Sequence, residues 1–351
     1  MKKSRPVPFR FVQILAVLAV MFLVVSAAAA ESEFEPCFCF DSGLNARKKA
    51  PTNARFLTEG AYTLTPLDPK KADKYGVDPE YMPDTKGMDT LNISGSAEFS
   101  GDQFRELAKR LRELANGKEI YIVDCRIEDH ALLNGISVSW YGKRNWANKG
   151  KTLAEAEEDE RARFGALEGS VVTVYTVSGD TLGKSVEMEV TSVMFEKELV
   201  ENEGFHYLRL PCLDHSWPDE EAVDQFIGFV QTIDPDRSWL HFHCHAGKGR
   251  TAIFMAIYDM MKNPDVAFED IMLRQAMTGG SYLPYADPES DIAEVHAKRA
   301  KRIRQIYDYL QEMNGSYTTP WSEWIANQEA GQGMGKQPGN SVSYQSHLLH
   351  A

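Results

Sequence analysis

Apolar and polar residues follow one another along the chain with helical spacing in some segments and strand-like character in others. Residues 100–117 carry apolar side chains every three or four positions, and Ser100 with Gln103 forms a capping box, which predicts a helix closed at Gly117. The continuously apolar run 120–123 predicts a buried strand. Further predicted elements are strands at 205–210 and 239–242, a helix opening at Pro218 and a helix from about 250 to 263. This alternation favours an α/β fold.

Two β-rich runs interrupt the alternation. Residues 171–177 and 186–193 are separated by the polar, glycine-containing segment 178–183, as in a long hairpin or a fragment of a barrel. We therefore expect a small β-rich subdomain around 165–200, inserted into the main domain.

The first thirty residues have the three regions of a secretory signal peptide. A basic start precedes the apolar run 11–25, and the small-residue segment 27–30 follows it ahead of Glu31. The apolar run is short for a membrane span. We expect cleavage near Ala30, with a retained N-terminal anchor as the alternative. The mature protein is then periplasmic or extracellular, with no stable membrane partner.

Composition divides the rest of the chain. Residues 31–50 are weakly patterned and predict an extended arm, and residues 51–328 form the main domain. Residues 329–351 are rich in Gly, Gln, Asn and Ser, which predicts a flexible tail. No internal repeat is visible, so we expect one functional unit.

The charge of the chain restricts its partners. The net charge of the 351 residues is −13, and the leader holds four basic and no acidic residues, so its removal would leave −17. Such an acidic protein is a poor nucleic-acid binder. A polyanionic substrate would need a local basic pocket that works against the overall field. The sequence leaves the oligomeric state open.

The cysteines predict neither a disulfide scaffold nor a metal site. Five cysteines are few and odd in number, so at least one thiol lacks an intramolecular disulfide partner. Cys37 and Cys39 lack the CxxC spacing of redox or zinc motifs. No HExxH motif, paired CxxC or carboxylate cluster is visible, so we expect no metal and no cofactor.

The segment 243–251, His-Cys-His-Ala-Gly-Lys-Gly-Arg-Thr, lies between a predicted strand and a predicted helix. Five residues between Cys244 and Arg250 let the backbone amides surround one phosphoryl group, which Arg250 can grip with two nitrogens. The amides, the helix dipole and Arg250 should lower the pKa of Cys244. The pattern therefore predicts a nucleophilic thiolate beneath a phosphate cradle.

This segment resembles the signature of the protein tyrosine phosphatase superfamily, HCxxGxxR[ST]. The resemblance implies that Cys244 is the nucleophile and Arg250 the transition-state clamp. It also implies that His243 orients the loop and tunes the thiol, and that the Thr251 hydroxyl assists release of the thiolate.

A narrower resemblance covers most of the mature chain. Ten short segments look like the bacterial cysteine phytases, which dephosphorylate myo-inositol hexakisphosphate stepwise through a phosphocysteine. These segments are residues 81–83, 87–91, 93–96, 134–136, 138–142, 146–148, 213–215, 217–218, 241–244 and 319–322. The resemblance implies a phosphatase-like α/β core with an inserted partial β-barrel.

Two aspartates are candidates for the general acid. Asp219 belongs to a Trp-Pro-Asp string like that of tyrosine-specific phosphatases, but it also suits the first turn of a helix. Asp214 with His215 matches the Asp-His pair of the cysteine phytases. We favour Asp214 as the acid, with His215 contacting a substrate phosphate.

Several residues are candidates for binding phosphate groups. In the loop they are His245, Ala246, Gly247, Lys248 and Gly249, although a solvent-facing His245 is slightly favoured. Outside the loop they are Arg55, Arg299, Lys184 in the hairpin, and Asn145, where relatives often carry Asp. The last difference leaves open which inositol position is attacked first.

Other functions remain open. A secreted phosphotyrosine or phosphoinositide phosphatase would use the same chemistry, and Lys248 keeps the second of these in view. A non-catalytic phosphate-binding module is the alternative from a different class, although Cys244, Arg250 and Asp214 are all present. A sulfurtransferase or arsenate reductase would not explain the phytase-like segments.

Overall fold

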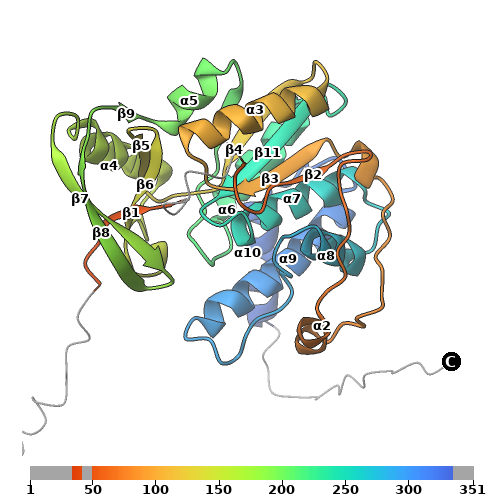
Figure 1. Cartoon of the computed structure of the whole chain (residues 1–351). Helices are drawn as coiled ribbons and strands as arrows, with labels where there is room; N and C mark the ends of the chain where they lie inside the picture. Colours follow the sequence, from red (N-terminus) through yellow and green to blue (C-terminus); the bar gives the residue numbers. More distant parts are fainter. Residues whose placement is uncertain (1–33, 42–49, 335–351) are drawn as a thin grey trace, which may run out of the picture. The chain divides into compact units, whose positions relative to one another are not determined.

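The computed structural model describes residues 34–41 and 50–334 (Figure 1). The predicted signal peptide and the tail from residue 335 onward lie outside the described residues. In the described ranges, no helix has the length and apolar character needed to cross a bilayer.

A five-stranded sheet forms the centre of the α/β core. Its order is β10 (His206–Arg209), β4 (Glu119–Asp124), β11 (Ser238–Cys244), β3 (Ile93–Ala97) and β2 (Arg55–Leu57). The first four strands are parallel and β2 is an antiparallel edge. The strands predicted at 120–123, 205–210 and 239–242 are confirmed. β11 is buried along its whole length because strands flank both of its edges and helices cover both faces.

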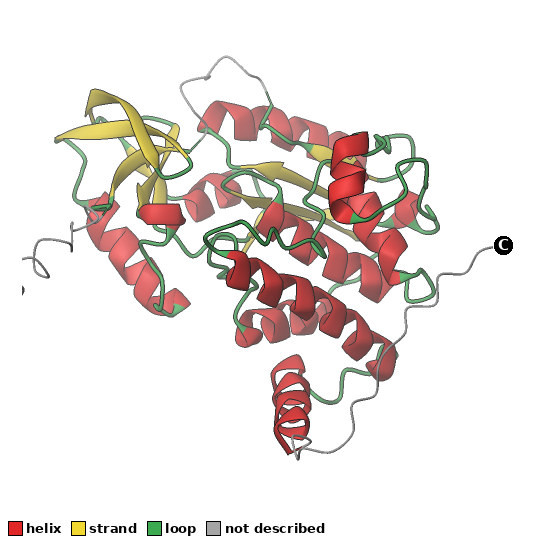
Figure 2. Ribbon diagram, turned by 90° about the horizontal axis from the view of Figure 1, so that it is seen from below, coloured by secondary structure: helices red, strands yellow, loops and turns green. Residues whose placement is uncertain are grey.

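Helices cover both faces of this sheet (Figure 2). On one face lie α3 (Gly101–Ala115), with its predicted capping box, and α5 (Glu196–Asn202). On the other lie α6 (Glu220–Thr232), α7 (Gly249–Lys262), α8 (Phe268–Met277), α9 (Ala293–Met313) and α10 (Trp321–Met334). The larger hydrophobic core lies between β11 and this second group, with Phe226, Phe242 and Phe254 at edge-to-face angles. Shorter elements are α2 (Pro69–Tyr75), η1 (Met88–Thr90) and η2 (Lys143–Asn145).

The second sheet is larger than the sequence predicted. Its order is β8 (Thr181–Glu189), β7 (Val171–Ser178), β1 (Cys37–Phe40), β6 (Ile136–Tyr141), β5 (His130–Leu133) and β9 (Val193–Met194), with α4 (Leu153–Gly165) beside it. The β-rich part is therefore not confined to 165–200. The reason is long-range pairing, since β1 pairs with β6 on one side and β7 on the other. The strand order gives an open sheet, and the partial barrel stays a prediction.

Three other sequence predictions need correction. Residues 37–40 of the predicted arm form β1, because their backbone groups find partners in β6 and β7. The predicted long hairpin is confirmed, but its turn is shorter than the segment 178–183, because the strands pair as far as Ser178 and Thr181 and leave Gly179, in the left-handed region, and Asp180 between them. The tail does not begin at 329, since α10 continues to Met334 and is anchored by Trp321 and Ile325 in the core.

Candidate active site

The loop between β11 and α7 has the form of a phosphate cradle. Its carbonyl groups face outward, because Asn53 Nδ2 donates to Ala246 O (2.8 Å) and Arg55 Nη1 donates to Gly247 O (2.6 Å). This arrangement leaves the amide side of the loop for a ligand. Gly247 has φ +69°, and a Cβ there would lie 2.3 Å from Ala97 N, so only glycine fits. Gly249 meets no such restriction.

Cys244 lies at the base of the cradle with only 2% of its surface exposed. The hydroxyl of Thr251 donates to its Sγ at 3.2 Å. Burial alone would raise the pKa of Cys244, but the Arg250 cation and the Thr251 hydrogen bond outweigh it, so this pKa is lowered. Burial instead raises the pKa of Cys125 and Cys212 far above the ordinary value. Of these three buried cysteines, Cys244 is therefore the one whose surroundings favour the reactive thiolate.

Replacing Thr251 by valine should raise the pKa of Cys244. The variant loses a hydrogen bond to the charged form of the thiol, so less thiolate exists at any given pH. We expect the midpoint of iodoacetamide alkylation to move up by about one to two pH units. Alkylation of Cys244→Ser gives the background from other thiols. An unchanged midpoint would show that Thr251 does not stabilise the thiolate.

Arg250 is held in place by protein groups. Its Nη1 donates to Glu128 Oε2 at 2.6 Å and its Nη2 to Glu128 Oε1 at 3.0 Å. Nη1 also approaches Cys212 O at 3.2 Å. Its Nε lies 3.2 Å from Asp214 Oδ1 without the geometry of a hydrogen bond. The guanidinium is thus fixed from one side and keeps Nε for a ligand or Asp214.

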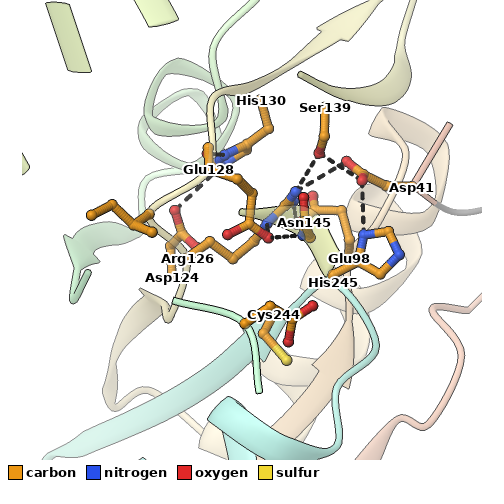
Figure 3. A network of polar contacts seen from close by, with 12 residues as sticks. Asp41, Glu98, Asp124, Arg126, Glu128, His130, Ser139, Asn145, Cys244 and His245 are labelled. Atoms are coloured by element: carbon orange, nitrogen blue, oxygen red, sulfur yellow. Dashed lines mark hydrogen bonds and ion pairs between the residues drawn. The ribbon is translucent and has the colours of Figure 1, made fainter. Parts of the chain in front are cut away.

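Glu128, the partner of Arg250, also belongs to a buried network of charged residues. Figure 3 shows this network around Arg126. Arg126 Nε donates to Glu128 Oε1 at 2.9 Å, and its Nη1 donates to Glu98 Oε2 at 2.6 Å. Nη2 of Arg126 reaches Asp41 Oδ2 at 3.3 Å. The spacing of residues along the chain does not predict this network. Its one local signal is the charged segment 126–130, which directly follows a buried strand.

His245 belongs to this network and is not the solvent-facing residue that the sequence slightly favoured. Its Nδ1 lies 2.9 Å from Asp41 Oδ1, and Asp41 also accepts hydrogen bonds from Ser137 and Ser139. Burial opposes the charge on His245, but Asp41 outweighs it and raises the pKa. The imidazole therefore braces the cradle from the side of β1 and β6.

His243 is a fully buried residue of β11. Its Nδ1 lies 3.2 Å from Glu98 Oε2 and its Nε2 lies 2.7 Å from Glu196 Oε1. Burial disfavours a charged ring, but Glu196 and Glu98 together raise the pKa of His243 far above the ordinary value. The imidazolium thus ties the base of the cradle to the start of α5.

The fold assembles buried carboxylates that the sequence had not shown as a cluster. Among the described residues, Glu98, Glu196 and His243 form one group with atoms within 4.8 Å, and Asp124, His130 and Glu196 form another. Two ligands of one tetrahedral ion would lie about 3.3 Å apart. The 2.7 Å between His243 Nε2 and Glu196 Oε1 is shorter, and fits an imidazolium–carboxylate pair.

The two candidate acids have different surroundings. Asp214 faces Arg250, and its backbone is fixed because Trp146 Nε1 donates to Asp214 O at 2.8 Å. His215 follows with φ +65°, is exposed, and its carbonyl accepts from Arg299 Nη1 at 3.4 Å. Asp219 is the exposed N-cap residue of α6 and lines a separate cavity of about 420 Å³. The structure therefore brings Asp214, and not Asp219, to Arg250.

The predicted basic residues do not all lie together. Lys248 and Arg299 line a cavity of about 490 Å³ beside the cradle, and Asn53 links its rim to the loop. Arg55 is buried behind the loop, with Nε and Nη2 lacking hydrogen-bond partners. Lys184 is exposed on β8 and does not line this cavity.

Asn145 is buried rather than open to a substrate. Its Nδ2 donates to Glu128 Oε1 at 2.6 Å, so it takes part in fixing the carboxylate that holds Arg250. It adopts φ +63°, a conformation that asparagine tolerates better than most residues. Through this contact, Asn145 lies behind the cradle and not on its phosphate-binding side.

Comparison with known proteins places this geometry in a family. The PTP-like phytase model, described as "Inositol hexakisphosphate", matches residues 123–262. A tandemly repeated protein tyrosine phosphatase-like phytase from Mitsuokella multacida superposes with a TM-score of 0.76 at 39% identity, over 88% of this chain and 52% of that one. The chain is therefore similar to the PTP-like phytases. The predicted phosphatase-like α/β core is thereby confirmed.

Two further PTP-like phytase structures align over most of the chain. A Mitsuokella multacida PTP-like myo-inositol phosphatase in complex with myo-inositol-(1,3,4,5)-tetrakisphosphate has a TM-score of 0.76 at 37% identity, over 90% of this chain and 54% of that one. A PTP-like phytase from Bdellovibrio bacteriovorus has a TM-score of 0.63 at 29% identity, over 84% and 96%.

A further relative is similar in sequence. The effector protein hopD2 of Pseudomonas syringae pv. tomato is 26% identical over 256 residues, which are 69% of this chain and 53% of that protein. This chain therefore spans about half the length of hopD2 and of the two Mitsuokella chains. The PTP-like phytase family match includes the cradle and both candidate acids, and excludes Arg55 and Arg299.

Proposed function

We propose that this protein is a phytase that removes phosphate groups stepwise from myo-inositol hexakisphosphate. The observation that carries the proposal is a thiol of lowered pKa in a phosphate cradle beside a basic cavity. The match of residues 123–262 to the PTP-like phytase family model supports it, as does the inositol tetrakisphosphate bound to a Mitsuokella relative. The substrate is thus a small polyanion.

In the first half of the reaction, the Cys244 thiolate attacks phosphorus in line with the ester oxygen. The phosphorus–oxygen bond breaks, and Asp214 donates its proton to the leaving inositol oxygen. Arg250 and the amides of the cradle bind the three equatorial oxygens as charge redistributes among them. The products are phosphocysteine and the less phosphorylated inositol.

In the second half, Asp214 takes a proton from water, which attacks phosphocysteine. The sulfur–phosphorus bond breaks, and inorganic phosphate and the thiolate are released. The Thr251 hydroxyl, 3.2 Å from Sγ, stabilises the departing thiolate. His243 and His245 act as positioning residues because each lies against a buried carboxylate, Glu196 for His243 and Asp41 for His245.

We further propose that the protein works after export, in the periplasm or outside the cell. The basic start, apolar run and alanine segment of residues 1–30 support this location. Expression of the full chain in a bacterial host, followed by N-terminal sequencing of the periplasmic fraction, tests it. A cytoplasmic product that still begins at Met1 would contradict it.

Phosphate release distinguishes the phytase from the alternatives. We expect the purified protein to hydrolyse inositol hexakisphosphate with a higher kcat/KM than a phosphotyrosine peptide or a phosphoinositide. Cys244→Ser, measured alongside, subtracts contaminating activity. Preference for either alternative substrate would replace the proposed function, and absence of turnover with all three would favour a non-catalytic binding module.

Asp214→Asn should lower kcat about 10²- to 10⁴-fold with inositol hexakisphosphate, because the asparagine amide cannot act as the acid that protonates the leaving inositol oxygen. Asp219→Asn removes an exposed carboxyl of the same type that lies in a different cavity, so it should retain near-normal turnover. Steady-state kinetics across pH compare the two. Near-normal turnover in Asp214→Asn with collapse in Asp219→Asn would reverse the assignment.

A further inference from the structure

Part of the lining of the cavity beside the cradle comes from a helix outside the two sheets. Helix α2 contributes Lys71 and Tyr75, which are four residues apart and so share one face of the helix. Figure 1 shows α2 apart from the sheets, on the extended segment that follows β2. Lys248 of the cradle lines the same cavity, so the cavity begins where the phosphate cradle ends.

Contacts hold α2 against the segment that follows α8. Tyr75 stacks on Tyr282 with ring centroids 5.0 Å apart, and its ring also lies 5.0 Å from that of Tyr285. Lys74 Nζ bonds Asp287 Oδ2 at 2.7 Å. The same segment is joined to the cradle, because Ser281 N donates to Lys248 O at 3.3 Å. These contacts therefore fix α2, and with it Lys71, in a defined position relative to the cradle.

The charges lining the cavity favour an anion. Lys71, Lys248 and Arg299 are basic, and the single acidic residue of the lining, Asp287, is already paired with Lys74. His296 adds a ring that can donate a hydrogen bond. This basic lining contrasts with the net charge of −13 of the whole chain. A cavity of about 490 Å³ also has the size of a small-molecule site.

We propose that Lys71 is a specificity-determining residue that binds a second phosphate group of the substrate, on the side of the cavity away from the ester being cleaved. The proposal rests on the proposed function and deepens it. Among the described residues, Lys71 makes no hydrogen bond or ion pair with the cradle, so its contribution depends on a substrate with a phosphate that reaches α2. Esters with several phosphate groups are then selected over monophosphates.

Lys71→Met tests the proposal, with Lys70→Met as the matched control. Lys70 is an exposed lysine of the same helix that does not line the cavity. For each protein we measure kcat/KM with inositol hexakisphosphate and with para-nitrophenyl phosphate, and take their ratio. We expect the ratio to fall about tenfold in Lys71→Met, mainly through KM, and to stay at the wild-type value in Lys70→Met. Lys71→Arg should restore it.

An equal ratio in the wild type and in Lys71→Met would overturn the proposal. A ratio that falls equally in Lys70→Met would also overturn it, because general surface charge would then explain the effect. A wild type that hydrolyses para-nitrophenyl phosphate but not inositol hexakisphosphate would refute the proposed function instead. In that case the role of Lys71 is tested by using inositol hexakisphosphate as an inhibitor of para-nitrophenyl phosphate hydrolysis. Equal inhibition constants in Lys71→Met and Lys70→Met would reject the role of Lys71.

Discussion

Cys244→Ser is expected to lower the turnover of inositol hexakisphosphate by at least about 10⁴-fold. The serine hydroxyl is a far weaker nucleophile, and Arg250 and Thr251 stabilise an anion that serine does not form at neutral pH. The fold should be retained, because serine is close to cysteine in size and the loop is braced by Asn53 and Arg55. Phosphate-release kinetics measure the loss.

Rapid acid quenching of the wild type during turnover should trap phosphate on Cys244. Mass spectrometry of the peptide that contains residues 239–250 locates the adduct. Cys37→Ser is the matched control, since it removes a thiol in β1 that lies outside the cradle. Undiminished hydrolysis in Cys244→Ser, or an adduct on another residue, would refute a phosphocysteine at this position.

Glu128→Gln should lower kcat/KM about 10²- to 10³-fold and also reduce the melting temperature. Glu128 is buried and its carboxylate faces two guanidinium groups, those of Arg250 and Arg126. Removing one partner of a buried ion pair costs about 3–5 kcal/mol, because the remaining charge is uncompensated. Arg250 would also lose the two hydrogen bonds that direct it toward the phosphate.

Glu157→Gln provides the control for Glu128→Gln. Glu157 is a partly exposed carboxylate of α4 whose basic partner, Arg161, lies 3.8 Å away. Kinetics should be recorded well below the melting temperature of each variant, and phosphate inhibition should weaken only in Glu128→Gln. A lower melting temperature with unchanged kcat/KM and unchanged phosphate inhibition would limit Glu128 to a structural role.

The contacts of Glu128 also show why the sequence did not predict this part of the site. Its partner Arg250 is 122 positions away, and Asp41 and His245 are 204 positions apart. Neither pair leaves a local pattern in the chain. The segment 126–130 shows only an unusual density of charge after a strand, which is more often a solvated surface. Burial of these groups depends on the second sheet covering them.

Residue patterns along the chain were enough to predict the strand, loop and helix around Cys244, because these elements are consecutive in the chain and need only local backbone geometry. Gly247 and the capping box at Ser100 are local in the same sense. The pairing of β1, the aspartate that faces Arg250 and the place of α2 at the cavity became known from the folded chain. Those outcomes depend on contacts between distant segments, and such contacts are set by topology and packing rather than by residue spacing.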